Sequence, residues 1–263
     1  MTSTTSPAVG TIVSAAEAKG ARVGLSAILP DGTSINHREN EVFKSASTIK
    51  IAIMIELFRR VEAGDLLLDQ RYVLKQEDKV PGNGVLQELH AGIELTLRDV
   101  LYLMMSISDN PATKILIDHV SMDAVNATMR ELGLQVSVLG RPMRGRPANP
   151  DEQENLATPA EFARLIAAIM DGTAASAESC MAMLEMLKLQ ANDKRIGRFV
   201  PADMEWGSKT GSYDTVVNDV GFVMTKDGPL IISIFSEDVA DVVTGEAIIS
   251  EIVRELLMSS LDS

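Results

Sequence analysis

Ser47-Thr48-Ile49-Lys50 opens the apolar run 49–61, which predicts a buried helix that starts at Ser47 and stops before Gly64. Residues three apart lie on one face of a helix, so we expect the Ser47 hydroxyl and the Lys50 amine to be within reach of each other. Desolvation and the helix dipole disfavour the charged amine there, which would let Lys50 accept the serine proton. Taken alone, the tetrapeptide is explained more simply by a capping serine and a surface lysine.

On either side of this stretch, turn and cap signals predict strands near both ends of the chain and helices in the middle. We expect helices over residues 7–18, 96–105, 121–133, 158–170, 178–189 and 244–258, a hairpin over 22–43, and strands over 206–213, 218–225 and 230–235. This order predicts an α+β fold: an antiparallel sheet built from both ends of the chain, flanked by helices, with an inserted helical subdomain. We expect one domain over 1–263, with the α/β part near 1–46 and 191–263 and the helical subdomain near 47–190.

Composition and charge exclude several classes of protein. The 263 residues are 46% apolar and carry a formal net charge of −13, which argues against nucleic acid or an anionic membrane surface as a partner. The single cysteine, Cys180, rules out an intrachain disulfide, and no run is apolar for the roughly eighteen residues of a membrane span. No signal peptide is visible. The sequence therefore predicts a cytoplasmic protein, or a secreted one whose leader was removed, and it allows a monomer or a homodimer.

Two more tripeptides are candidate catalytic or substrate-binding motifs. Ser108-Asp109-Asn110 follows a predicted helix, 61 residues after Ser47, and Lys209-Thr210-Gly211 lies in a predicted strand 101 residues further on. The glycine would let a ligand approach the strand backbone closely. Each tripeptide is weak alone, but the three motifs in this order strongly favour a serine hydrolase.

The three motifs resemble those of class A β-lactamases and penicillin-binding-protein-type serine hydrolases. The resemblance extends over nearly the whole chain, through residues 94–99, 192–196 and 207–212. It implies that Ser47 attacks a carbonyl, that Lys50 accepts its proton, and that Ser108 passes a proton to the leaving amine. It also implies residues that bind the substrate. Asn110 would bind a side-chain amide of the substrate, and Lys209 and Thr210 would bind an anionic group. The backbone N–H of Ser212 would join that of Ser47 in an oxyanion hole. Asp109 is expected to orient its loop, and no metal or cofactor is implied.

The loop over residues 140–155 departs from the family pattern. Class A β-lactamases keep a glutamate there, in E-x-x-L-N, to activate the water that releases the acyl-enzyme, and this chain has no such motif. Residues 141–144 fall near the glutamate's place. Glu152 or Glu154 is a possible substitute base, although solvated loop carboxylates are the simpler interpretation, and Asn155 is a candidate for the family's asparagine.

Three functions remain open from the sequence. The first is a metal-free serine hydrolase that acts through an acyl-serine on a β-lactam, or on a related small amide or ester that carries an anionic group. The second is a cytoplasmic carboxylesterase, or a peptide amidase or D-amino-acid peptidase, with weak β-lactam turnover, in which Lys50 is the base for both steps. The third is a non-catalytic penicilloyl-binding sensor.

Overall fold

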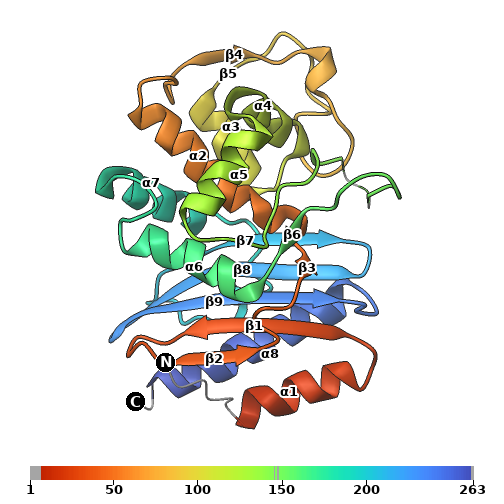
Figure 1. Cartoon of the computed structure of the whole chain (residues 1–263), viewed down its shortest axis with the longest axis vertical. Coiled ribbons are helices and arrows are strands. Elements are labelled where there is room, and N and C mark those ends of the chain that lie inside the picture. Colours follow the sequence, from red (N-terminus) through yellow and green to blue (C-terminus); the bar gives the residue numbers. More distant parts are fainter. Residues whose placement is uncertain (1–6, 145, 147, 262–263) are drawn as a thin grey trace.

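A five-stranded antiparallel sheet forms the lower half of the molecule in Figure 1, a computed structural model that describes residues 7–144, 146 and 148–261. The strand order is β2-β1-β9-β8-β7. Its strands are β1 (Arg22–Ile28), β2 (Ser34–His37), β7 (Trp206–Tyr213), β8 (Val216–Thr225) and β9 (Gly228–Glu237). The pairing of β1 with β9 joins the two ends of the chain, which confirms the predicted α+β fold.

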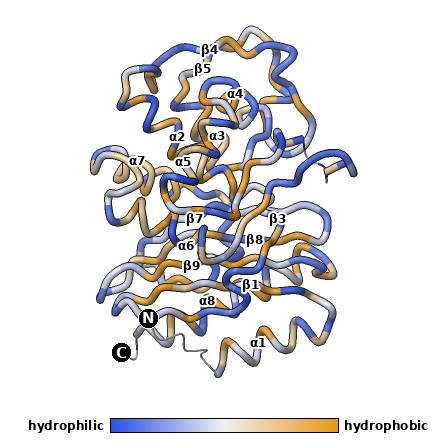
Figure 2. Tube along the Cα trace, viewed as in Figure 1, coloured by the Kyte–Doolittle hydropathy of each residue, from blue (hydrophilic) through white to orange (hydrophobic). Residues whose placement is uncertain are grey.

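Helices cover both faces of this sheet. On one face α1 (Pro7–Glu17) and α8 (Val242–Leu261) pack against each other and against the strands, and on the other lie α6 (Pro159–Met170) and α7 (Ala177–Lys188). Because side chains alternate along a strand, Ile232 of β9 belongs to the core under α1 and α8, while its neighbour Ile231 belongs to the other core. Figure 2 shows the resulting hydrophobic colour along the strands and the inner helices.

The rest of the helices gather above the sheet in Figure 1. They are the 3-10 turn η1 (Ala46–Ile49), α2 (Lys50–Glu62), α3 (Leu97–Ser106), α4 (Asn110–Val120) and α5 (Met122–Glu131). The predicted burial of α2 is confirmed, since each residue from Lys50 to Phe58 is buried. The predicted start at Ser47 is wrong, because Ser47 lies within η1 and α2 begins at Lys50.

The reason for this difference lies in tertiary contacts of the residues before the helix. The carbonyl of Ser45 accepts hydrogen bonds from the Thr48 amide and hydroxyl, and from Asn218 Nδ2 on strand β8. Ala46 has a φ of 47°, a conformation that a non-glycine residue adopts only when its surroundings hold it there. The chain therefore turns tightly before the helix instead of entering it through a capping serine.

Short elements complete the fold. The strand pairs β3 (Phe43–Lys44) with β6 (Leu156–Ala157) and β4 (Arg71–Val73) with β5 (Glu94–Thr96) are two-stranded, and η2 (Gln76–Asp78) and η3 (Ile196–Phe199) are 3-10 turns. A capping box at Thr96 opens α3, close to the predicted helix start at residue 96, and in it Thr96 Oγ1 accepts from the Asp99 amide at 3.1 Å. None of the described helices is both long and apolar enough to span a membrane. The predicted domain count and boundaries stay predictions.

Candidate active site

Ser47 lies where two cavities of the cleft meet. Both cavities are lined by Ser47, Asn83 and Ser212. The Arg195 lobe, of about 380 Å³, is completed by Ser106, Ile107, Ser108, Gln190, Ala191, Asn192, Arg195 and Thr210. The Glu154 lobe, of about 320 Å³, is completed by Ala46, Gly82, Asn110, Arg141, Met143, Arg144, Arg146, Glu154, Asn155, Tyr213 and Asp214. A group bonded to Ser47 could therefore extend to either side.

Strand β7, an edge strand of the sheet, approaches the Ser47 turn very closely. A Cβ on Gly211 would lie 2.9 Å from the Ser47 amide nitrogen, so only glycine fits at this position. The sequence predicted a glycine that admits a ligand, whereas the structure shows that this glycine admits the backbone of the turn that holds Ser47. From β8, Asn218 Nδ2 donates to the Lys44 and Ser45 carbonyls at 2.9 and 3.2 Å and holds the same turn.

The Lys50 amine joins the first two motifs. Its Nζ donates to the Ser108 carbonyl at 2.8 Å, to Ser108 Oγ at 3.0 Å and to Asn110 Oδ1 at 3.2 Å. Ser108 has a φ of 61°, a left-handed conformation uncommon for serine. Among the hydrogen bonds of the described residues, none joins Ser47 Oγ to Lys50 Nζ, so the expected hydrogen-bonded pair is not formed in this structure.

Burial changes the acidity of Lys50. The side chain is fully buried, and desolvation, followed by the nearby charge of Lys209, lowers the pKa of Lys50 well below its usual value, against the partial opposition of Asp109. A buried amine that sheds its proton more readily can act as a base near neutral pH. A lowered pKa is what the base role requires, and that Lys50 accepts the serine proton stays a prediction.

Lys209, the lysine of the third motif, is also fully buried, within β7. Its Nζ donates to the Thr210 carbonyl at 2.9 Å. Desolvation lowers the pKa of Lys209 to about 7; the charge of Asp219 opposes this shift and that of Arg195 adds to it. The positive charge at this end of the cleft therefore depends on pH within the neutral range.

Asp109 holds the loop above the cleft. Its carboxylate is fully buried and accepts hydrogen bonds from the amides of Ala112 at 2.8 Å, Val85 at 2.6 Å and Leu86 at 2.9 Å. It caps α4 and fixes the loop at Val85 and Leu86 at the same time. A Cβ on Gly84 would lie 2.3 Å from Asp109 Cγ, so a glycine is required beside this carboxylate.

Arg195 is a residue of the cleft to which the sequence assigned no role. Its guanidinium donates to the carbonyls of Gly211 and Asn218 at 3.1 and 2.7 Å, and to Ser212 Oγ at 2.5 Å. Glu246 of α8 lies 3.4 Å from Arg195 Nε. The only signal in the sequence was the resemblance at residues 192–196, because nothing local brings this arginine to β7. It adds a second cation to the end of the cleft that holds Lys209 and Thr210.

The two candidate carboxylates of the loop occupy different places. Glu152 is not among the residues that line either lobe, and it pairs with Arg146 at 2.7 and 2.9 Å. Glu154 lines its lobe, where burial would raise the pKa of its carboxyl, but hydrogen bonds from Arg141 and from backbone amides outweigh burial and lower it. That either one acts as a base stays a prediction.

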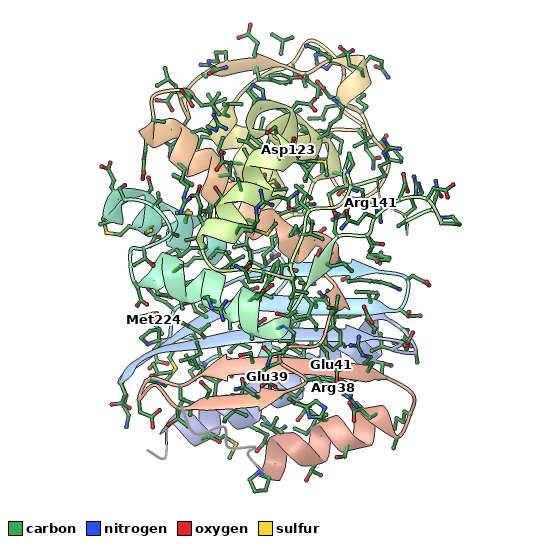
Figure 3. The ribbon with its side chains drawn as sticks, viewed as in Figure 1. Arg38, Glu39, Glu41, Asp123, Arg141 and Met224 are labelled. Carbon is green, nitrogen blue, oxygen red and sulfur yellow. The ribbon has the colours of Figure 1, made fainter. Side chains whose placement is uncertain are left out.

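Met143 is a loop residue that lines the same lobe as Ser47. Of residues 141–144, Arg141, Met143 and Arg144 line the Glu154 lobe together with Ser47. Figure 3 shows Arg141 between the upper helices and the sheet, and this side chain is paired with Glu154 at 3.0 Å. Met143 Sδ accepts from Asn155 Nδ2 at 3.3 Å. A thioether cannot take a proton from water at neutral pH.

Comparisons with known proteins agree on the family. The sequence profile described as the β-lactamase enzyme family matches residues 8–259. A β-lactamase of Rhodobacter capsulatus is 31% identical over 238 residues, which cover 87% of this chain and 79% of that protein. The crystal structure of a β-lactamase from Sphaerobacter thermophilus is similar with a TM-score of 0.95 and 48% identity, covering 97% of this chain and 98% of that one.

A more distant structure shares the fold. A mutant of PBP-A, solved as an acyl-enzyme complex with penicillin G, is similar with a TM-score of 0.86 and 24% identity, covering 97% of this chain and 96% of that one. At this identity the likeness bears on the fold alone.

The hydrogen bonds of Asp109 lead to a stability prediction. Asp109→Asn should lower the free energy of unfolding by ~2–4 kcal/mol, because the amide cannot accept all three backbone N–H bonds and leaves buried donors unpaired. Urea unfolding measures this loss, and faster hydrogen exchange at Val85 and Leu86 locates it. Asp123→Asn is the control, since Asp123 is exposed at the start of α5 and should change stability by less than ~1 kcal/mol. Equal stability of the two variants would contradict the role of Asp109.

Proposed function

Because this chain belongs to the β-lactamase enzyme family, we propose that it is a serine hydrolase that opens β-lactams, or related small amides and esters carrying an anionic group, through an acyl-enzyme on Ser47. The observation that carries the proposal is the position of Ser47 at the junction of the two lobes, beside the network of Lys50, Ser108 and Asn110. That network supplies what a weak nucleophile needs, namely a base and a route for its proton.

Acylation follows from these neighbours. Ser47 Oγ attacks the carbonyl carbon and passes its proton to the neutral amine of Lys50. Lys50 already donates to Ser108 Oγ, so the proton can be relayed through Ser108 to the leaving nitrogen as the carbon–nitrogen bond breaks. An ester between Ser47 and the acyl group remains, and the freed nitrogen carries the proton; in an opened β-lactam this nitrogen stays attached to the acyl group through the rest of the opened ring.

The close contact between β7 and the nucleophile turn supports an oxyanion hole. The backbone amides of Ser47 and Ser212 would donate to the oxygen that gains charge, and each such donor contributes about 3 kcal/mol in comparable enzymes. Arg195 bonds to the Gly211 carbonyl and to Ser212 Oγ, and these contacts fix the strand segment that carries one of the two donors. Rigid placement of donors is what makes such a site effective.

The Arg195 lobe is suited to an anionic group of the substrate. Thr210, Ser212 and Arg195 line it, and the buried amine of Lys209 lies in the same strand. Two cations and two hydroxyls offer charge-assisted hydrogen bonds to a carboxylate. The amide of Asn110, on the side of the Glu154 lobe, would hold the acyl portion.

Release of the acyl group is the step in which this enzyme differs from relatives that keep the loop glutamate. Met143 and Asn155 line the lobe where that base would act, so we propose that Lys50 serves as base for both steps and that β-lactam acyl groups leave slowly. Activated esters should then be turned over faster than β-lactams. Such a preference is the one expected of the carboxylesterase or amidase alternative. A permanent adduct without hydrolysis of any acyl substrate would indicate a penicilloyl-binding sensor. A cytoplasmic location and a monomeric or dimeric state are part of the proposal.

The role of Ser47 leads to the first prediction of this proposal. Intact-mass spectrometry of the enzyme with benzylpenicillin should show an added mass equal to the whole antibiotic, because ring opening keeps all its atoms. Ser47→Ala should abolish both the adduct and the hydrolysis of p-nitrophenyl esters, since no other nucleophile is proposed. Ser45→Ala, at a buried serine two residues away, should retain the adduct. An adduct on Ser47→Ala would contradict the mechanism.

The pKa of Lys209 leads to a prediction about pH. Its charge is present below about pH 7 and lost above it, so binding of a carboxylate should weaken by about tenfold from pH 6 to pH 8. The measurement compares inhibition constants of two boronic acids that differ only by a carboxylate, because their ratio cancels the titration of boron and of Lys50. Lys209→Gln should remove the pH dependence of this ratio. A ratio that is constant in the unchanged enzyme would contradict the assignment.

The position of Met143 leads to a prediction about acyl release. Met143→Glu should speed release of a penicilloyl group by at least about tenfold, because even an imperfectly placed general base supplies part of the roughly 10²–10⁴-fold that a well-positioned one contributes. Acylation should change much less, because Lys50 remains its base. Time-resolved intact-mass measurement of adduct decay separates the two steps, and Met143→Gln, which is similar in size and cannot act as a base, is the control. Equal decay in the two variants would contradict the proposed place of Met143.

A further inference from the structure

We propose that the hydrogen bond from Tyr213 to Glu154 is a clamp that holds the loop over residues 140–155 against the end of β7, and that this clamp restricts the Glu154 lobe to compact acyl groups. Tyr213 and Glu154 would then be specificity-determining residues. The inference rests on the proposed function, because it concerns the acyl side of the same cleft.

The two ends of the loop are joined to each other independently of Tyr213. Val138 and Leu156 exchange backbone hydrogen bonds of 3.0 Å, and the Arg141 amide donates to Asn155 Oδ1 at 2.9 Å. A Cβ on Gly140 would lie 2.5 Å from the Glu154 carbonyl oxygen, so a glycine is needed for the two arms to lie this close. The base of the loop is thus closed by its own contacts.

Two attachments then fix the loop to the walls of the cleft. On the side of the nucleophile, the Ser45 amide donates to the Asn155 carbonyl at 2.8 Å, next to the pairing of β3 with β6. On the side of the sheet, the Tyr213 hydroxyl donates to Glu154 Oε2 at 3.1 Å. The first attachment is made by backbone atoms, and the second by two side chains. The second can therefore be removed by substitution while the first stays in place.

The carboxylate of Glu154 accepts hydrogen bonds both from residues of the loop and from Tyr213. From the residues that the structure describes, its carboxylate receives five hydrogen bonds: from Arg141 Nε at 3.0 Å, Arg141 Nη2 at 3.2 Å, the Asn155 amide at 2.8 Å, the Ala148 amide at 3.2 Å and Tyr213. Burial, with the charge of Glu154, raises the pKa of Tyr213, so the hydroxyl keeps its proton and remains a donor. A hydrogen bond to an ionised, partly buried carboxylate is stronger than one between neutral groups.

The clamp fixes the distance across the lobe. Met143 and Asn155 form the loop wall, and Ser212 and Tyr213 form the strand wall, of a cavity of about 320 Å³ that begins at Ser47. An acyl group that extends into this lobe must fit between the two walls. Tyr213 directly follows Ser212, so a wide acyl group that displaced Tyr213 would also disturb the strand segment that carries a proposed oxyanion donor. A bulky acyl group is therefore disfavoured in binding and in reaction.

The test compares two tyrosine substitutions. Tyr213→Phe removes the hydroxyl and keeps the ring. Tyr72→Phe is the matched control, because Tyr72 also donates to a carboxylate, Asp78 Oδ2 at 2.6 Å, and lines neither lobe. Each enzyme is treated with benzylpenicillin, which has a compact arylacetyl group, and with methicillin, whose dimethoxybenzoyl group is branched next to the amide. Second-order acylation rates are measured by intact mass.

We expect the ratio of the two rates, compact over bulky, to fall by about tenfold in Tyr213→Phe, the effect of losing one charge-assisted hydrogen bond. The ratio should stay within about twofold of the unchanged enzyme in Tyr72→Phe. Amide hydrogen exchange over residues 140–155 should accelerate in Tyr213→Phe alone. An unchanged rate ratio or unchanged loop exchange in Tyr213→Phe would overturn the clamp while the proposed function stands. Failure of both penicillins and of a p-nitrophenyl ester to acylate the unchanged enzyme at Ser47 would instead overturn the proposed function, and the specificity inference with it.

Discussion

Burial of the Lys50 amine is the constraint around which the cleft is arranged. An ammonium group removed from water is costly unless acceptors surround it. Here the acceptors are the carbonyl and hydroxyl of Ser108 and the amide oxygen of Asn110. These groups come from the junction between α3 and α4, so satisfying one lysine of α2 also sets the positions of the second motif. The same burial lowers the pKa of Lys50 and makes the amine available as a base.

The sheet contributes the opposite wall through an edge strand. Because β7 has a free edge, its backbone can face the nucleophile turn, and Gly211 lets the two backbones come within contact distance. Arg195 and Asn218 hold the two sides of this contact, one by the strand carbonyls and the other by the carbonyls of the turn. The polar groups that would bind an oxyanion and a carboxylate are thus positioned by tertiary hydrogen bonds and not by the local conformation of one segment.

The loop over residues 140–155 keeps its place in the fold although the chain lacks the E-x-x-L-N motif there. Its closing contacts join Val138 to Leu156 and Arg141 to Glu154. Glu154, a carboxylate of this loop that lines the cleft, has its oxygens occupied by hydrogen bonds from Arg141 and the Asn155 amide, and Met143 lines the same lobe as Ser47. The hydrogen bonds that close this loop therefore do not depend on the glutamate of the E-x-x-L-N motif.

The sequence by itself determined the helices, the strands and the motif residues. These depend on local rules: the apolar period of α2, the capping box at Thr96, and the alternation of the strands. The sequence also pointed to Lys50 as a buried base and to Asp109 as an orienting residue. Tertiary structure alone decided that Ser47 lies in a 3-10 turn, that Lys50 bonds to Ser108 and not to Ser47, and that Arg195, Met143 and Tyr213 line the cleft. The physical reason is that each of these outcomes depends on hydrogen bonds or packing between residues far apart in the chain, which no local pattern encodes.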